Sequence, residues 1–154
     1  MVTFQKETAY TLLREAKDLF AQHYLEEASQ PDIPMDLDTE KYLRAYELGQ
    51  YRVYTVRDTD HDDKLVGYGA FVVVTNIQAK TSLNAMLEAL YLDHDYRGGT
   101  TAVRFLTFIK EQLKADGVQL IRMHASPEGG FAHLLTKMQY TMVKHEFELR
   151  LDKE

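Results

Sequence analysis

Two adjacent glycines, Gly98 and Gly99, stand between a strand-like stretch and a helix-like stretch, and this turn is the segment best suited to chemistry. Glycines let the main chain approach a ligand closely, and the first turn of a helix leaves backbone N–H groups without partners. The helix dipole adds positive character there, and Arg97 adds a full charge. The Gly-Lys-Ser/Thr ending of a P-loop and the three-glycine dinucleotide fingerprint are both missing. By itself the turn therefore predicts only an anion site, such as one for a phosphate.

The stretches on both sides of this turn predict the elements that hold it. Residues 83–92 are typical of a strand, and Gly117 stands where the following helix should stop. We expect another strand over Val118–His124. The helix is indicated by apolar residues at helical spacing, namely Ala102, Phe105, Leu106, Ile109 and Leu113.

The N-terminal half predicts a short strand at residues 2–4, one amphipathic helix over Thr8–Glu27 and a second helix capped by Thr39. Two β-rich stretches, 51–57 and 65–75, then indicate a hairpin. Its tip has aspartates at the alternate spacing that opens a calcium loop, but the Gly and Glu that such a loop requires are absent. We therefore expect a solvated tip, formed by Asp58, Asp60, Asp62 and Asp63, and no metal site.

The C-terminal part predicts one more helix and one more strand. Pro127 suits the first turn of that helix. Residues 143–151 alternate between apolar and charged side chains, as a half-buried strand does. The helix should bury Phe131, Leu134, Leu135 and Met138. Without a repeat or a linker, residues 1–154 are expected to form a single domain of the α/β (α+β) class.

Composition and charge limit the classes of molecule that the protein is expected to bind. The chain has 154 residues, 45% of them apolar, no cysteine and a net charge of −6. All the excess acid lies in residues 1–66, which hold 8 Lys+Arg and 14 Asp+Glu, whereas residues 67–154 hold 10 of each. This balance argues against nucleic acid and suits a cationic partner, although the acid could serve solubility alone. We expect no membrane span and a cytoplasmic protein.

The order of elements and the run Leu92–Ala102 together resemble the GNAT superfamily of acetyltransferases. Members end a strand with hydrophobic-x-Pro and open the main helix with Arg/Gln-x-x-Gly-x-Gly/Ala. His94 stands in place of the usual Pro, and Thr100 in place of the central Gly. The residues that match are Leu92, Tyr96, Arg97, Gly98 and Ala102.

The resemblance continues over Glu128–Tyr140, which lies over the family pattern Asn-x-x-Ala-x-x-Leu-Tyr-x-Lys-x-Gly-Phe. Leu134, Lys137 and Tyr140 agree with it. Leu135 replaces the Tyr that often acts as general acid. The other departures are Glu128, Phe131 and Gln139.

The resemblance implies a mixed, mostly antiparallel sheet flanked by about four helices, with two strands splayed around a CoA site. It implies acetyl-CoA as co-substrate, with the pantetheine arm along Leu90, Tyr91 and Leu92. The diphosphate would be held by the backbone amides of Arg97, Gly98, Gly99, Thr100, Thr101 and Ala102.

The resemblance also implies direct attack of an amine on the thioester, assisted by a base. Glu88 is the first candidate, with the strand parity of Leu90 and Leu92, because a carboxylate in so apolar a strand is costly unless paired or near water. Alternatively, Glu88 lies on an exposed face or pairs with an Arg. His124 could relay a proton and Tyr91 could act as acid, but each also suits an ordinary strand-end or core role.

The acceptor implied is a primary amine: a polyamine, an amino-sugar, a peptide N-terminus or a lysine. In this family the acceptor site is lined by the first helices and the hairpin, where the excess acid of this chain lies. One alternative is a catalytically degenerate GNAT-fold module that binds acyl-CoA or another protein. Another is an acidic α/β protein of unrelated fold. The sequence does not fix the oligomeric state, and a homodimer remains one option.

Overall fold

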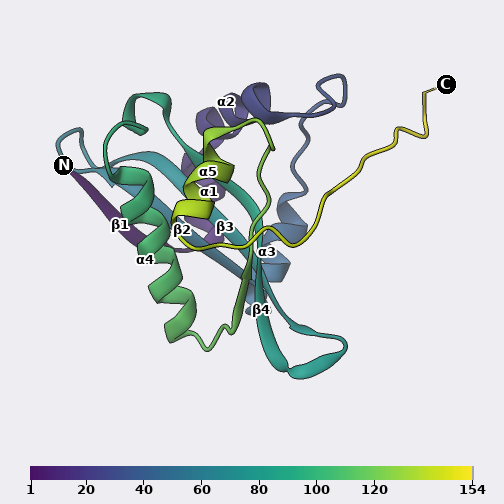
Figure 1. Cartoon of the computed structure of the whole chain (residues 1–154). Helices are drawn as coiled ribbons and strands as arrows, with labels where there is room; N and C mark the ends of the chain where they lie inside the picture. The colour runs from purple at the N-terminus through teal and green to yellow at the C-terminus, as the bar shows by residue number, and fades with distance from the viewer. Residues whose placement is uncertain (154) are drawn as a thin grey trace. The chain divides into compact units, whose positions relative to one another are not determined.

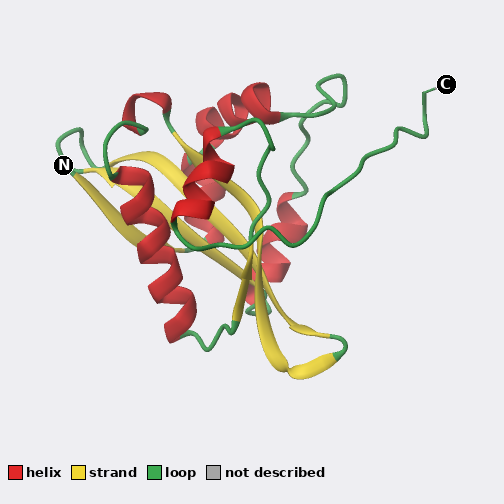
Figure 2. Ribbon diagram, in the orientation of Figure 1, coloured by secondary structure: helices red, strands yellow, loops and turns green. Residues whose placement is uncertain are grey.

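A computed structural model describes residues 1–153 of the chain, which form two compact units, Met1–Met123 and the residues from His124 onward. The first unit holds a sheet and four α-helices, and the second holds one (Figures 1 and 2). None of the helices among residues 1–153 is long and apolar enough to cross a bilayer. A single domain over residues 1–154 stays a prediction.

The first unit is built on a five-stranded sheet with strands in the order β1-β2-β3-β4-β5. Neighbours from β1 to β4 are antiparallel, and β5 runs parallel to β4. This confirms the predicted mixed, mostly antiparallel sheet and the predicted hairpin. The strands are β1 (Val2–Glu7), β2 (Tyr51–Asp58), β3 (Lys64–Asn76), β4 (Ala79–Leu92) and β5 (Leu120–Arg122).

The helices of the first unit lie close to their predicted positions. They are α1 (Ala9–Glu15), α2 (Lys17–Glu27), α3 (Thr39–Glu47) and α4 (Thr101–Ala115), with a short 3₁₀ turn, η1, at His94–Tyr96. Gly117 has φ +84°, as expected for the residue that follows a helix end. Asp38, not Thr39, caps α3, because its side chain accepts a hydrogen bond from the Lys41 amide at 3.0 Å.

The single helix predicted over Thr8–Glu27 is two helices, because the backbone of Ala16 leaves the helical region at φ −98° and ψ 13°. The break is short. The Ala16 amide still bonds to the Leu12 carbonyl, and the Phe20 amide bonds to the Ala16 carbonyl. With Ala16 itself fully buried, Leu12 and Leu19 both stay in the core on the two sides of the kink.

Helices cover both faces of the sheet. On one face, Leu12 of α1 and Leu19 of α2 share a buried cluster with Tyr68 and Ala70 of β3. The other face packs on α4, where Phe105 stacks on Phe4 of β1 with ring centroids 5.5 Å apart. The polar sites described below therefore lie next to a rigid scaffold.

Gly69 of β3 is required for the close approach of α4. A Cβ at this position would lie 3.0 Å from the Cδ1 atoms of Ile109 and of Leu90. Ile109 is fully buried, so it has little room to move aside.

Three predictions near the C-terminus are wrong. The strand predicted over Val118–His124 covers only Leu120–Arg122. Pro127 precedes the last helix, since α5 (Gly130–Lys137) begins with Gly129 as N-cap. Of its predicted stripe, Leu135 is buried, and Phe131, Leu134 and Met138 are partly buried.

The third wrong prediction is the strand over residues 143–151. The structure describes these residues as chain without regular secondary structure. Phe147 is 90% exposed, Leu149 83% and Leu151 88%. An alternating pattern forms a strand only where another strand offers backbone partners. The described residues of the second unit contain no such strand.

Candidate functional site

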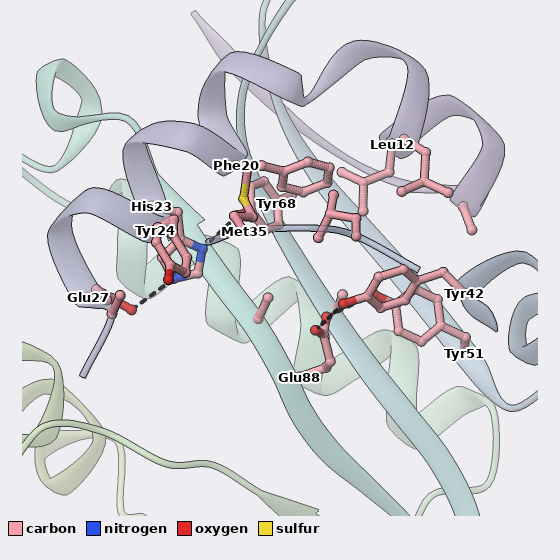
Figure 3. A pocket seen from close by; sticks show the side chains of 16 residues that line it. Leu12, Phe20, His23, Tyr24, Glu27, Met35, Tyr42, Tyr51, Tyr68 and Glu88 are labelled. Carbon is pink, nitrogen blue, oxygen red and sulfur yellow. Dashed lines mark hydrogen bonds and ion pairs between the residues drawn. The ribbon is translucent and has the colours of Figure 1, made fainter. Parts of the chain in front are cut away.

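A cavity of about 300 Å³ lies in the first unit between the sheet and the first three helices (Figure 3). We call it the Glu88 cavity, after the carboxylate on its β4 wall. Helices α1, α2 and α3, the loop between α2 and α3, and strands β2, β3 and β4 all contribute to it. Its lining consists of Ala9, Leu12, Leu13, Phe20, His23, Tyr24, Glu27, Ala28, Met35, Leu37, Tyr42, Tyr51, Tyr68, Ala70, Glu88 and Ala89.

Glu88 enters this cavity because β4 is irregular at that residue. Ala70 of β3 pairs with Ala89, but the next residue, Phe71, pairs with Leu87, so Glu88 is an extra residue in β4. Such a bulge places two consecutive side chains on one face of a sheet. Glu88 and Ala89 accordingly both line the cavity.

The expected parity of Glu88 with Leu90 and Leu92 is therefore wrong. Leu90 lies beside Gly69 on the face that packs on α4, whereas Glu88 contacts Tyr51, which belongs to the cluster on the other face. The bulge separates them, because it shifts the alternation by one residue.

Two tyrosine hydroxyls hold the Glu88 carboxylate. Tyr42 donates to Oε1 at 2.8 Å, and Tyr51 donates to Oε2 at 2.9 Å (Figure 3). Burial raises the pKa of both phenols, and the nearby Glu88 charge raises it further, so both stay protonated donors. The Glu88 side chain is exposed, as one alternative predicted, and its partners here are phenols rather than an arginine.

A second chain of hydrogen bonds runs along another wall of the cavity. The Tyr68 hydroxyl lies 2.6 Å from Nδ1 of His23, and Nε2 of His23 lies 2.8 Å from Glu27. The His23 ring also stacks on Tyr91, with centroids 5.0 Å apart. The sequence pattern did not predict a functional role for His23, Glu27 or Tyr68. The only local signal is the i,i+4 spacing of His23 and Glu27 on a helix.

Tyr91 faces α2. Its hydroxyl donates to Oε1 of Glu26 at 2.8 Å, and the residue is 3% exposed. Burial is the main cause that raises the pKa of Tyr91 to about 12, followed by this hydrogen bond. Its role as a general acid stays a prediction.

The glycine turn, which we define as Tyr96–Ala102, is anchored by two side chains. Arg97 binds the Glu26 carboxylate at 2.6 Å and the Leu92 carbonyl at 2.8 Å. Tyr96 donates to Asp58 at 2.7 Å, a bond that raises the pKa of Tyr96 to about 12. Asp58 is thus buried and paired, unlike the solvated residue that was predicted.

The main chain of the glycine turn is open. Gly99 has φ +69°, a conformation that favours glycine, and no atom lies within 4 Å of where a Cβ of Gly98 or Gly99 would be. Thr100, the N-cap of α4, makes no side-chain cap bond. The first N–H groups of this helix have no intrahelical partners, so the turn can accept an anion.

Strands β4 and β5 separate just before this turn. Their pairing covers only Asn84–Met86 of β4, so among the described strands no partner lies along the other edge of residues 87–92. The predicted pantetheine-binding residues Leu90, Tyr91 and Leu92 are on this free stretch. It follows Glu88 along β4, and η1 then leads from its end into the glycine turn.

His124 belongs to the second unit and is exposed, two residues after β5 ends. Its role as a proton relay stays a prediction. Among residues 1–153, no group of three or more His, Cys, Asp or Glu side chains could hold a metal ion.

Comparison with known proteins identifies the fold and the family. No curated protein matches the chain. An aminoglycoside acetyltransferase, HMB0005, from an uncultured soil metagenomic sample superimposes with a TM-score of 0.76 at 13% identity, over 98% of this chain and 99% of that one. A ribosomal-protein-alanine N-acetyltransferase from Brucella melitensis biovar Abortus 2308 gives 0.68 at 14%, over 98% and 99%.

Glucosamine-6-phosphate N-acetyltransferase from Arabidopsis thaliana gives a TM-score of 0.66 at 13% identity, over 99% of both chains. At these identities the structures establish the fold alone. The acetyltransferase (GNAT) family model matches residues 11–137, most of the chain. The chain therefore belongs to the GNAT family of acetyltransferases.

Proposed function

We propose that this protein transfers an acetyl group from acetyl-CoA to a primary amine by direct attack, with Glu88 as the base. The observation that carries the proposal is the bulge at Glu88. It puts a carboxylate into a cavity right beside the free edge of β4 that leads to the glycine turn.

The chain has groups suited to each part of acetyl-CoA. The open main chain from Gly98 to Ala102 and the uncapped start of α4 fit a diphosphate. The free backbone edge of Leu90–Leu92 fits an extended amide-bearing arm. The bound co-substrate supplies the acetyl group as a thioester.

Glu88 would accept the proton that the amine loses, directly or through a water. Each of its carboxylate oxygens accepts one tyrosine hydrogen bond, and a carboxylate has about four acceptor positions, so positions remain for an ammonium or a water. The neutral amine then forms the C–N bond as the C–S bond breaks. The new amide nitrogen loses its second proton, the CoA thiolate takes up one proton, and CoA leaves as the thiol. Tyr42 and Tyr51 fix the orientation of the base.

The test replaces the base while keeping its shape. Glu88→Gln should lower kcat/KM for the amine by about 10²- to 10⁴-fold, the usual contribution of a positioned base. KM for acetyl-CoA should stay the same, because the glycine turn is intact. The measurement is CoA release with a panel of amine acceptors.

Glu40→Gln is the matched control, since Glu40 is an exposed carboxylate on α3 that lines no part of the cavity. A Glu88→Gln enzyme as active as wild type would contradict the role of Glu88. Binding of acetyl-CoA without turnover of any amine would instead favour a degenerate acyl-CoA-binding module.

A further inference from the structure

The lining of the Glu88 cavity is poor in groups that recognise hydroxyls or amides. Among the 16 described residues that line it, none is Ser, Thr, Asn, Gln, Asp, Lys or Arg. The walls are aliphatic and aromatic. Such a surface favours an apolar ligand body, because few atoms are present to replace the water bonds of a polar one.

The tyrosine hydroxyls of the cavity already have partners. Tyr42 and Tyr51 donate to Glu88, and Tyr68 bonds to His23. Tyr24 donates to the Gln30 carbonyl at 3.4 Å. The oxygens of these tyrosines can still accept hydrogen bonds, but they have no O–H left to donate to a ligand. A sugar ring placed here would therefore lose water at several hydroxyls and gain few replacement bonds, at a cost of about 1–3 kcal/mol for each buried unpaired group.

The cavity nevertheless has a place for one positive charge. Its two carboxylates are Glu88 and Glu27, and the described lining has no Lys or Arg, so the local field attracts a cation. Glu88 lies on the β4 wall beside the aromatic rings of Tyr42 and Tyr51, whose faces also attract an ammonium. Glu27 is already paired with His23, and its side chain is 64% exposed.

We infer that the acceptor is a small monoamine with an apolar body, of the arylalkylamine type, whose ammonium binds at Glu88. This inference rests on the proposed function. The ring of the amine packs among the side chains of Leu12, Phe20 and Met35. The cavity volume of about 300 Å³ is at the small end of the usual range for ligand sites, about 300–1,000 Å³, and fits a compact molecule.

Two other amine classes fit less well. Amino-sugars lack partners for their hydroxyls, as argued above. A polyamine would carry a second ammonium, and the described lining offers it only Glu27, a carboxylate that His23 already holds. A charge without a free partner is strongly disfavoured on the rest of the apolar wall.

The experiment compares 2-phenylethylamine with glucosamine and spermidine as acceptors, in the presence of acetyl-CoA. We expect kcat/KM for 2-phenylethylamine to be higher by about 100-fold, because glucosamine would leave hydroxyls unpaired and spermidine would leave its second ammonium without a free partner. Binding of each amine to the protein alone is measured by calorimetry, with 2-phenylethanol as the uncharged analogue. The alcohol should bind at least tenfold more weakly than the amine.

A pair of variants tests whether the cavity is the site. Met35 lines it and is 39% exposed, so Met35→Lys adds a cation to the cavity that holds the amine. We expect a rise of about fivefold in KM for 2-phenylethylamine, as one repulsive pair would give, and no change for acetyl-CoA. Leu25→Lys adds the same charge on α2 at a residue that is 84% exposed and outside the lining, and it should have no effect.

The outcomes separate the inference from the proposed function. Turnover of glucosamine or spermidine at least as efficient as that of 2-phenylethylamine overturns the inference and leaves the acetyltransferase. Binding of 2-phenylethylamine without turnover of any amine supports the ligand class and overturns the proposed function. If the protein neither binds nor acetylates 2-phenylethylamine, the inference is wrong.

Discussion

The Glu88 cavity is made of side chains, and the glycine turn is made of main chain. The cavity draws its lining from seven segments of the first unit, and its polar groups hold one another, as Tyr42 and Tyr51 hold Glu88. The turn is one short segment whose glycines leave open space beside the backbone.

Because of this difference, we expect the two sites to recognise different parts of the reactants. A backbone site binds whatever presents the right charge, and few side-chain changes disturb it. A side-chain site can change with each substitution, so it decides which acceptor is used. Cavity substitutions should therefore alter the acceptor, and only a change in charge or backbone should alter binding at the turn.

Charge at the turn should give the largest effect on the binding of acetyl-CoA. No atom lies within 4 Å of where a Cβ of Gly98 would be, so Gly98→Asp should fold normally while placing an anion beside the diphosphate. We expect Kd for acetyl-CoA to rise by about 10- to 100-fold, the result of one or two unfavourable charge contacts. Calorimetry with acetyl-CoA measures it.

Gly98→Asn has nearly the same shape without the charge and should weaken binding far less. Raising the salt concentration should narrow the gap between the two variants, because salt screens exposed charges. If Gly98→Asp and Gly98→Asn lost equal affinity for acetyl-CoA, the turn would act through its shape. The proposed contrast between a main-chain site and a side-chain site would then be wrong.

Variants of two tyrosines test whether the side chains of the cavity orient Glu88. Tyr51→Phe combined with Tyr42→Phe keeps both rings and removes both donors to Glu88. We expect kcat/KM for the amine to fall by about 5- to 20-fold, roughly the size of one ordinary hydrogen bond, because the base is less well oriented but still present. Steady-state kinetics with varied amine measures this.

Tyr10→Phe is the matched control for that double variant. It removes another phenol–carboxylate bond, from Tyr10 on α1 to Glu47 on α3, at a residue that does not line the cavity. Activity should stay at the wild-type level. If Tyr10→Phe loses as much as the double variant, the effect comes from the packing of the helices and not from Glu88.

The contrast between the two sites also explains which features of the structure the sequence could predict. The glycine turn is local: Arg97, Gly98 and the helix that follows are contiguous, so sequence spacing was enough to locate it. The sheet and its helices followed from periodicity for the same reason. The kink at Ala16 has no such local signal, because alanine favours a continuous helix.

The cavity could be predicted only in part. The sequence singles out Glu88 as a costly carboxylate, but its direction depends on a bulge set by the register with Phe71. Its partners lie 37 and 46 residues away, beyond any local pattern. The strand expected over residues 143–151 shows the same limit, because alternation is local and a strand needs a partner.

The smallest expected effect concerns Glu26, the α2 side chain that binds Arg97 of the glycine turn. Glu26 accepts from Arg97 and from Tyr91, and these bonds, the Arg97 one first, hold the pKa of Glu26 below its usual range. Because the folded pKa is lowered, the stabilisation is complete above the unfolded pKa of about 4.3 and is lost as the pH falls through the folded value. Both partners are more than a third exposed, so water screens the pair to about 0.5 kcal/mol.

Glu26→Gln should thus lower the free energy of unfolding slightly near pH 7, and the gap from wild type should close at a pH below about 4. Denaturant unfolding at several pH values measures it, with Glu128→Gln, an exposed carboxylate of the second unit, as control. Binding of acetyl-CoA should change less than about twofold, because the amides that hold the diphosphate belong to the main chain. A tenfold loss of binding in Glu26→Gln would mean that side chains position the turn, and the two sites would then be built alike.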